Sequence, residues 1–318
     1  MHFKKFCSNS IISFLSILFG LILSELAGIK MGLGDPVIYK RDNIVGYRLM
    51  PNQKKIRRNN SKIYTDSEGF RIDHTKIRKN KNNYLVFVGD SVTYGGSYID
   101  NKNIFSSKFC ENFYEKYFCL NSGINGWGVI NMGRFISNFN LYSKIKPEKF
   151  ILVILPGDEK RNFQKIEGLP FWDAPPKKPS ALNEVTNFLV RKYILPNLKS
   201  KKTSSMLDSK KTNKQDNFQR KIIWKELAYL IKNSNYEIDI VITPPIKWFD
   251  SNLFLEERRD YDRFLSEISK LKVVKNTCNL YYYVLPEFKK ELYVDGVHLS
   301  ESGHDLWAKK LNECLNIR

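Results

Sequence analysis

The chain has 318 residues, enough to bury a substantial core in one large domain or two small ones. Hydrophobic residues make up 42% and aromatic residues 14%, which excludes a disordered chain. Lysine and arginine number 52 against 33 aspartate and glutamate, and the net charge of +19 favours an anionic partner: nucleic acid, acidic polysaccharide or anionic lipid. No RRM, zinc-finger or helix-turn-helix signature is present, so the sequence does not favour nucleic-acid binding.

A hydrophobic segment lies near the start of the chain. Lys4 and Lys5 precede an uncharged run from Ile11 to Leu23, and the apolar character resumes at Leu26 after Glu25. The run alone is short for a membrane span, but residues 11–31 together are long enough for one. We therefore predict a cytoplasmic tail at residues 1–10 and an uncleaved signal anchor, or transmembrane helix, at residues 11–31.

Two alternatives to the anchor are a cleaved signal peptide and a buried core helix. Cleavage after Ala27 would put Glu25 three positions before the cut, which is a poor site. Basic residues flank the segment close to the chain start, which argues against a core helix. The expected location is the cell inner membrane, in a single-pass topology with the remaining chain on the periplasmic side.

Four of the five cysteines follow the hydrophobic segment, namely Cys110, Cys119, Cys278 and Cys314. An exported domain could join them in up to two disulfides, with three possible connectivities, and buried unpaired thiols fit the sequence equally well. Their spacing matches no metal site, and the sequence predicts neither a metal nor a cofactor.

The remaining chain alternates strand and helix patterns. Residues 32–80 are rich in turn residues and predict a linker with a small hairpin around residues 63–64 and 70–72. Residues 81–318 predict one α/β domain with a flexible, lysine-rich insertion near 199–221. The expected strands are 84–88, 118–121, 149–155, 238–243 and 281–285, and the expected helices 104–117, 222–232, 255–271 and 302–315.

The first strand leads directly into Gly89-Asp90-Ser91. A serine at a turn from strand to helix lies at the carboxyl edge of a parallel sheet, where α/β folds bind their ligands. The simpler interpretation is that Asp90 or Ser91 caps the next helix.

A histidine with a nearby carboxylate lies close to the end of the chain. Asp295 precedes His298 by three residues in a loop, which lets the carboxylate reach Nδ1 of the imidazole while Nε2 takes a proton. Together with Ser91, the chain order Ser, Asp, His makes a hydrolytic triad possible.

These residues resemble the SGNH, or GDSL, hydrolases. Gly89-Asp90-Ser91 matches the block that carries the nucleophile, residues 121–126 resemble the second block, and Asp295-x-x-His298 matches the last. The resemblance implies a three-layer α/β/α fold with a flavodoxin-like parallel sheet of about five strands. It also implies esterase, lipase, thioesterase or acyl-transfer chemistry, with the backbone N–H groups of Ser91 and Gly126 in the oxyanion hole.

One position departs from the family pattern. The third block carries an asparagine that donates to the oxyanion, and here Asp158 occupies that position. Either Asp158 is protonated, or Arg161 or Asn162 provides the donor. Further candidates for lining the substrate site are Asp90, Trp127 and Trp172.

The sequence therefore predicts a membrane-anchored serine esterase that hydrolyses or transfers an acyl group of a cell-envelope glycan or lipid. The alternative is a catalytically silent module of the same fold that binds an acylated glycan or an envelope partner, and Asp158 is the residue that favours it.

Overall fold

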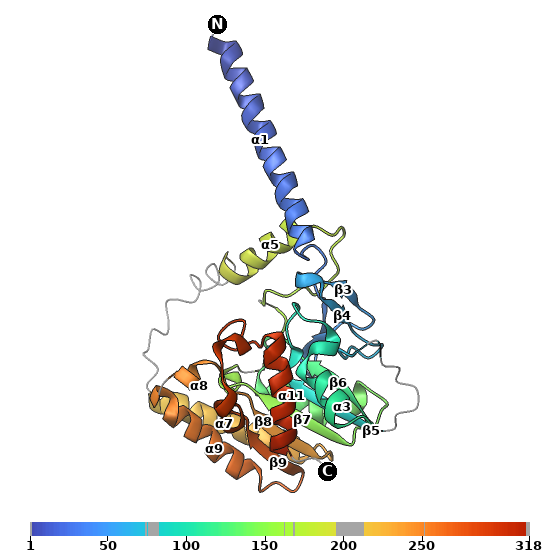
Figure 1. Cartoon of the computed structure of the whole chain (residues 1–318), viewed down its shortest axis with the longest axis vertical. Coiled ribbons are helices and arrows are strands. Elements are labelled where there is room, and N and C mark those ends of the chain that lie inside the picture. The colour runs from blue at the N-terminus through green and yellow to red at the C-terminus, as the bar shows by residue number, and fades with distance from the viewer. Residues whose placement is uncertain are drawn as a thin grey trace.

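The computed structural model of the chain describes residues 2–73, 75, 83–161, 163–167, 169–194, 213–250 and 252–315, without the side chains of 2–10, 213–218 and 252. A long helix, α1 (His2–Lys30), projects from a body built around a β-sheet (Figure 1). The insertion expected near 199–221 lies outside the described residues as far as 212, and helix α7 has begun by residue 213.

The body contains a five-stranded parallel sheet, which confirms the expected fold class. The strand order is β6-β5-β7-β8-β9, so the chain moves from β5 to one side and then returns to the other. The point where the order reverses lies at the carboxyl end of β5, which is where open α/β sheets bind ligands. The strands are β5 (Asn83–Gly89), β6 (Tyr117–Gly123), β7 (Lys149–Ile154), β8 (Ile238–Ile242) and β9 (Val274–Asn279).

Helices cover both faces of the sheet, because its central strands are apolar on both sides. Val86 and Val88 pack in one core with α4, α7 and α9, whereas Leu85 and Phe87 pack in the other with α3 and α11. The helices of the body are α2 (Ser91–Tyr94), α3 (Phe105–Phe113), α4 (Val129–Ser137), α5 (Ala181–Leu189), α7 (Asn213–Lys232), α8 (Lys247–Asp250), α9 (Leu255–Ile268), α10 (Tyr281–Val284) and α11 (Glu301–Leu315).

The position expected for the fifth strand is wrong. Residues 281–285 are not a strand: Tyr281 to Val284 form the short helix α10, and the fifth strand is β9. β9 lies at the edge of the sheet and carries Lys275 and Asn276, so it lacks the continuous apolar run that marks the central strands. Consecutive aromatic residues are typical of a strand. Here, however, the two buried residues are Tyr281 and Val284, whose spacing of three places them on one face of a helix.

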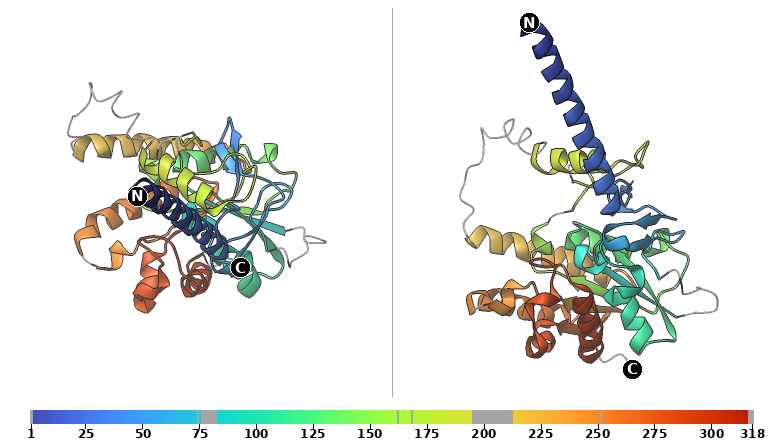
Figure 2. Two further views of the ribbon diagram at one scale, coloured as in Figure 1. Left: turned by 90° about the horizontal axis from the view of Figure 1, so that it is seen from above. Right: turned by 45° about the horizontal axis from the view of Figure 1, so that its top comes forward.

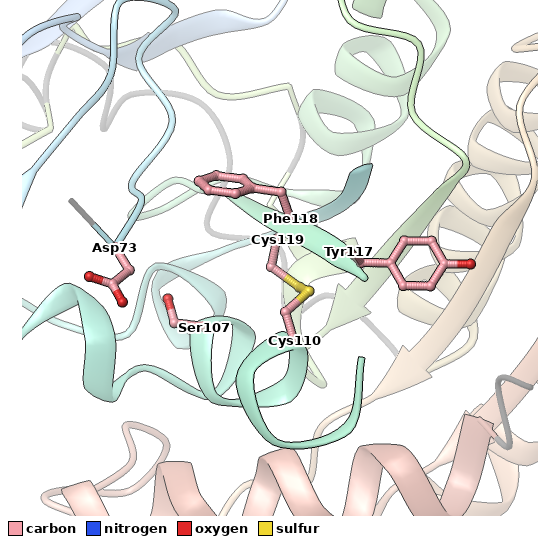
Figure 3. Close-up of a pocket in the computed structure, with 6 residues that line it drawn as sticks. All are labelled: Asp73, Ser107, Cys110, Tyr117, Phe118 and Cys119. Carbon is pink, nitrogen blue, oxygen red and sulfur yellow. A yellow bond between two sulfur atoms is a disulfide. The ribbon is translucent and has the colours of Figure 1, made fainter. Parts of the chain in front are cut away.

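Helix α3 is shorter than expected. It ends at Phe113 instead of reaching residue 117, and Tyr117 already begins β6. The disulfide between Cys110 and Cys119 joins the end of this helix to the strand, beside a cavity of about 20 Å³ (Figure 3). This cavity has room for about one water molecule and lies at the amino end of β6, opposite the edge that carries Ser91. A second disulfide, between Cys278 and Cys314, joins β9 to α11.

Residues 32–80, expected to form a linker with one hairpin, instead contain two antiparallel hairpins packed on the body. β1 (Tyr39–Asp42) pairs with β2 (Gly46–Leu49), and β3 (Lys54–Ile56) pairs with β4 (Lys62–Tyr64). The side chains of Tyr47, Leu49 and Ile63 are fully buried in the same core as α4. The turn residues predict a linker because no strand of these hairpins buries more than two side chains and β3 buries none.

Helix α1 is apolar and exposed. Its segment Ile11–Lys30 has a mean hydropathy of 2.1 and is only 6% buried, so it is long and apolar enough to cross a membrane and also meets the description of a signal sequence. The alternative of a buried core helix is wrong, since α1 projects from the body (Figures 1 and 2) and its large apolar side chains are exposed.

A buried histidine joins α11 to α3 and leads to a prediction about stability. Nδ1 of His304 accepts the backbone N–H of Phe105 at 3.1 Å, and its ring stacks on that of Phe105. Burial lowers the pKa of His304 from 6.5 to about 3. Between these values the unfolded chain binds a proton that the folded chain does not, so the free energy of unfolding falls as the pH drops below 6.5.

We expect His304→Gln, whose amide oxygen can still accept from Phe105, to weaken this pH dependence. His304 lowers the free energy of unfolding by at most about 1.4 kcal/mol for each pH unit below 6.5. Urea unfolding of the full-length protein in detergent, at about pH 7.5 and about pH 5, measures it. Equal losses of unfolding free energy in the wild type and the variant would contradict the assignment.

Candidate active site

Ser91 lies at the carboxyl end of β5, where the sequence places it. Oδ1 of Asp90 accepts the backbone N–H of Val92 at 2.9 Å and so caps the one-turn helix α2. The hydroxyl of Ser91 is not used for capping and lies 2.8 Å from Nε2 of His298. The capping interpretation is confirmed for Asp90, whereas the Ser91 hydroxyl is hydrogen-bonded to His298.

The structure also brings Asp295 to His298. Oδ2 of Asp295 lies 2.7 Å from Nδ1 of the imidazole, while Oδ1 accepts the backbone N–H groups of Val297 and His298 at 2.8 Å each. Partial burial raises the pKa of Asp295, but these hydrogen bonds outweigh it and lower the pKa below its usual value. The carboxylate is therefore ionised at neutral pH, and it orients the imidazole with Nε2 toward Ser91.

The loop that carries His298 is held from three directions. Its own backbone closes through the bond from the Val294 N–H to the His298 carbonyl at 2.9 Å. The Ile246 N–H, after β8, donates to the Gly296 carbonyl at 3.0 Å. The hydroxyl of Tyr98, from the loop after α2, donates to the Leu299 carbonyl at 2.8 Å. These bonds fix the imidazole relative to Ser91, although the two residues lie at opposite ends of the domain sequence.

The turn after β6 brings a backbone N–H to the same edge. Gly126 has a φ of +81°, a conformation that favours glycine, and the Tyr47 hydroxyl supports the turn by donating to the Asn125 carbonyl at 2.7 Å. Within the described part of the chain, the N–H groups of Ser91 and Gly126 donate to no acceptor. Backbone N–H groups without an acceptor at a sheet edge are the kind of donor that a developing oxyanion needs.

Close packing against β6 holds helix α2 in place. A Cβ at Gly123 would lie 2.0 Å from the Tyr94 backbone nitrogen, so only glycine fits at this position. The Asn121 side chain donates to the Thr93 carbonyl at 2.6 Å. The fully buried guanidinium of Arg71 donates to the carbonyls of Tyr94, Gly96 and Ile99 and so anchors the loop that follows α2.

Asp158 forms part of a buried charge cluster with Asp90 and Arg161. Oδ2 of Asp158 accepts the Leu155 N–H at 3.0 Å, and its Oδ1 lies 2.9 Å from Nη1 of Arg161 in an ion pair. The same Nη1 donates to Oδ2 of Asp90 at 3.0 Å. Both carboxylates are fully buried, whereas 38% of the Arg161 side chain is exposed.

The charges of this cluster act on the pKa of Asp158. Burial raises the pKa of Asp158 well above its usual value, and the negative charge of Asp90 raises it further, while Arg161 opposes both. Arg161 is the positive charge shared between the two acids. Nε and Nη2 of Arg161 donate to no residue in the described part of the chain and remain available as donors.

The other predicted lining residues fall in different places. Trp127 is fully buried and donates to the Tyr47 carbonyl at 3.0 Å, so it packs in the core instead of lining a cleft. Trp172 lines a surface cavity beside α5. Asn162 lies outside the described residues. Among the residues the structure describes, no group of three acidic, histidine or cysteine side chains could hold a metal.

Sequence reasoning missed three supporting residues, Tyr47, Arg71 and Tyr98. All three lie in turn-rich stretches and act through side chains that bond to backbone carbonyls. The alternation in Val45-Gly-Tyr-Arg-Leu49 was the one sequence signal that could have identified Tyr47 as a strand residue with a buried side chain.

No protein-family description matches the chain, and no curated protein matches it. Solved structures do. A member of the lipolytic G-D-S-L family from Veillonella parvula is 16% identical, with 74% of this chain and all of that one covered, at a TM-score of 0.45. Axe2, an acetylxylan esterase from Geobacillus stearothermophilus, is 16% identical over 74% of this chain and 94% of its own, at a TM-score of 0.41.

A further structure of similar arrangement is TesA, 11% identical over 73% of this chain and 97% of that one, at a TM-score of 0.43. At sequence identities this low, the similarity is one of fold alone. The chemistry of the site depends on the residues of this chain. The chain is similar to a solved member of the lipolytic G-D-S-L family, the family that its Gly89-Asp90-Ser91 motif resembles.

Proposed function

We propose that the protein is a membrane-anchored serine hydrolase that cleaves, or transfers, an ester-linked acyl group of a cell-envelope glycan or lipid. The observation that carries the proposal is the hydrogen-bonded series from Ser91 through His298 to Asp295, with distances of 2.8 and 2.7 Å. A nucleophile, a base and a residue that orients the base are the components of serine hydrolysis.

In this proposal Ser91 attacks the ester carbonyl while Nε2 of His298 takes the hydroxyl proton. The imidazolium that forms is stabilised by the ionised Asp295 on its Nδ1 side. The proton then passes to the leaving alcohol, and an acyl-enzyme remains on Ser91. Water, or a second alcohol in a transfer reaction, attacks this acyl-enzyme with His298 again acting as base.

The negative oxygen of the tetrahedral intermediate needs donors. The N–H groups of Ser91 and Gly126 are two, and Arg161 is our candidate for the third, in place of the asparagine that the family carries at position 158. Asp158 is then not a repelling charge in the oxyanion hole, because its oxygens contact Leu155 and Arg161. Its role is to hold Arg161, a positioning role.

The expected location is the periplasmic side of the inner membrane. Helix α1 has the length and hydropathy of a span, and two disulfides favour an oxidising compartment. A net charge of +19 suits an acidic glycan or an anionic lipid as the molecule that carries the ester. No cofactor is required by this chemistry.

Labelling with a fluorophosphonate tests the nucleophile. We expect the full-length protein to be labelled and Ser91→Ala not to be, because the probe reacts with an activated serine hydroxyl. Ser137→Ala is the matched control: Ser137 donates to the Gly133 carbonyl within α4 and should leave labelling unchanged. Absence of labelling in the folded wild type would contradict the hydrolase proposal. It would favour the alternative, a catalytically silent module that binds acylated ligands.

The charge cluster gives a second test. We expect Arg161→Ala to lower kcat for an aryl ester by about 10²–10³-fold, since it removes a donor and leaves two buried carboxylates uncompensated. Adding Asp158→Asn should recover part of this loss by removing one of those charges.

Thermal melting of each variant separates a rate effect from unfolding. Arg259→Ala, in an exposed ion pair with Glu256, is the control and should leave kcat unchanged. An unaltered kcat in Arg161→Ala, or a double variant no faster than the single one, would contradict the role assigned to Arg161.

A further inference from the structure

A helical segment beside α1 is attached to the rest of the protein mainly by polar contacts. It consists of α5 and the π-helical turn that continues it, Val190–Ile194, and we call residues 181–194 the α5 segment. The segment lies at the base of α1, apart from the helices that cover the sheet (Figures 1 and 2). The segment therefore packs on α1 and not on the sheet.

The contact between the two helices is specific. The carboxylate of Glu25 accepts the backbone N–H groups of Ala181 at 2.9 Å and Leu182 at 2.8 Å, and the Ser180 hydroxyl donates to it at 3.2 Å. A Cβ at Gly28 would lie 2.5 Å from that of Ala181, so the helices touch closely there. The acidic residue that interrupts the apolar run of α1 is thus bonded to the N-terminus of α5.

Polar contacts hold the side of the α5 segment that faces the body. Glu184 accepts the Gly34 N–H at 2.7 Å and pairs with Arg57, and Arg191 pairs with Asp173. Between the segment and the body lies a cavity of about 360 Å³, to which the segment contributes Glu184, Val185 and Phe188 and the body Pro170 and Trp172. Hydrogen bonds and ion pairs, and not hydrophobic burial, attach this side.

The segment also carries exposed apolar residues, of which Val185 and Phe188 line this cavity whereas Leu189, Tyr193 and Ile194 do not. Its apolar residues recur three or four positions apart along the helix, at Val185, Phe188, Leu189 and Tyr193, with Ile194 following. Between 39% and 54% of each of these residues is accessible to solvent. The Nζ of Lys192 lies 5.1 Å from the ring centre of Phe188 and 5.2 Å from that of Tyr193. Aromatic rings next to lysine are the composition of helices that lie at a membrane surface.

We infer that the α5 segment lies in the headgroup region of the membrane that α1 spans, with its apolar side toward the acyl chains. The helix α1 that it contacts is itself exposed and apolar, with Leu26 and Ile29 near the contact in sequence. Glu25 precedes Lys30 by five residues, or about 7 Å of helix. Interfacial helices insert about 5–10 Å, so this attachment places the α5 segment at a suitable depth.

The inference rests on the membrane anchor in the proposed function and adds an orientation to it. Phe171, from the chain between β7 and α5, lies next to Gly126: a Cβ there would be 3.3 Å from its ring. Arg191 of the α5 segment donates to the Phe171 carbonyl. The edge of the sheet that carries Ser91 is therefore tied to the segment and faces the lipid surface, where an ester in the headgroup region can reach it.

Spin labels on the full-length protein test the inference. In a Cys7→Ser background, a nitroxide on Leu189→Cys is compared with one on Leu18→Cys in α1 and one on Leu141→Cys, an exposed leucine before β7 on the body. The protein is reconstituted into vesicles of phosphatidylethanolamine and phosphatidylglycerol. Collision rates with oxygen, which concentrates in lipid, and with a water-soluble nickel complex give the depth of each label.

We expect the labels at positions 18 and 189 to collide more with oxygen than with nickel, and the label at 141 to show the reverse. A lipid-exposed label at 18 with a water-exposed label at 189 would overturn the inference. A water-exposed label at 18 would also overturn it, because α1 would not be in the bilayer. Fluorophosphonate labelling of the same samples reports on Ser91 separately, so failure of the lipid contact is distinguishable from failure of the proposed hydrolase.

Discussion

The parallel pairing of β5 with β6 on one side and β7 on the other is the constraint on which the site depends. Because these strands run in the same direction, the loops that follow them emerge together at one edge. Ser91, Gly126 and Arg161 follow β5, β6 and β7 in turn. Glycine at position 123 lets α2, which begins at Ser91, lie directly on β6.

Charge balance at this edge explains how aspartate is tolerated at position 158. Asp90 and Asp158 are both buried, and two buried carboxylates without a counterion would be costly. Arg161 lies within 3.0 Å of each and extends to the surface with part of its guanidinium unoccupied. The aspartate is therefore held in an ion pair, and in the proposed function Arg161 is the available donor.

Residues outside the sheet complete the site. Tyr47 comes from the β1–β2 hairpin and supports the Gly126 turn, and Arg71 holds the loop after α2. The chain between β7 and α5 links the same edge to α1 through Phe171 and Glu25. The N-terminal quarter of the chain is thus part of the body and of the site, and it connects both to the apolar helix.

The sequence by itself determined the class of fold, four of the five strands and the residues of the proposed triad, because long apolar runs and short polar motifs are local signals. It could not determine β9, since an edge strand packs on one face and has no continuous apolar run. Nor could it reveal the burial of Trp127, the hairpins of residues 32–80 or the bonds of Arg161. These depend on contacts between residues far apart in the chain, such as Arg161 with Asp90 and Glu25 with Ala181. Only the tertiary structure decided them, because partners of charged and polar groups are chosen by proximity in space.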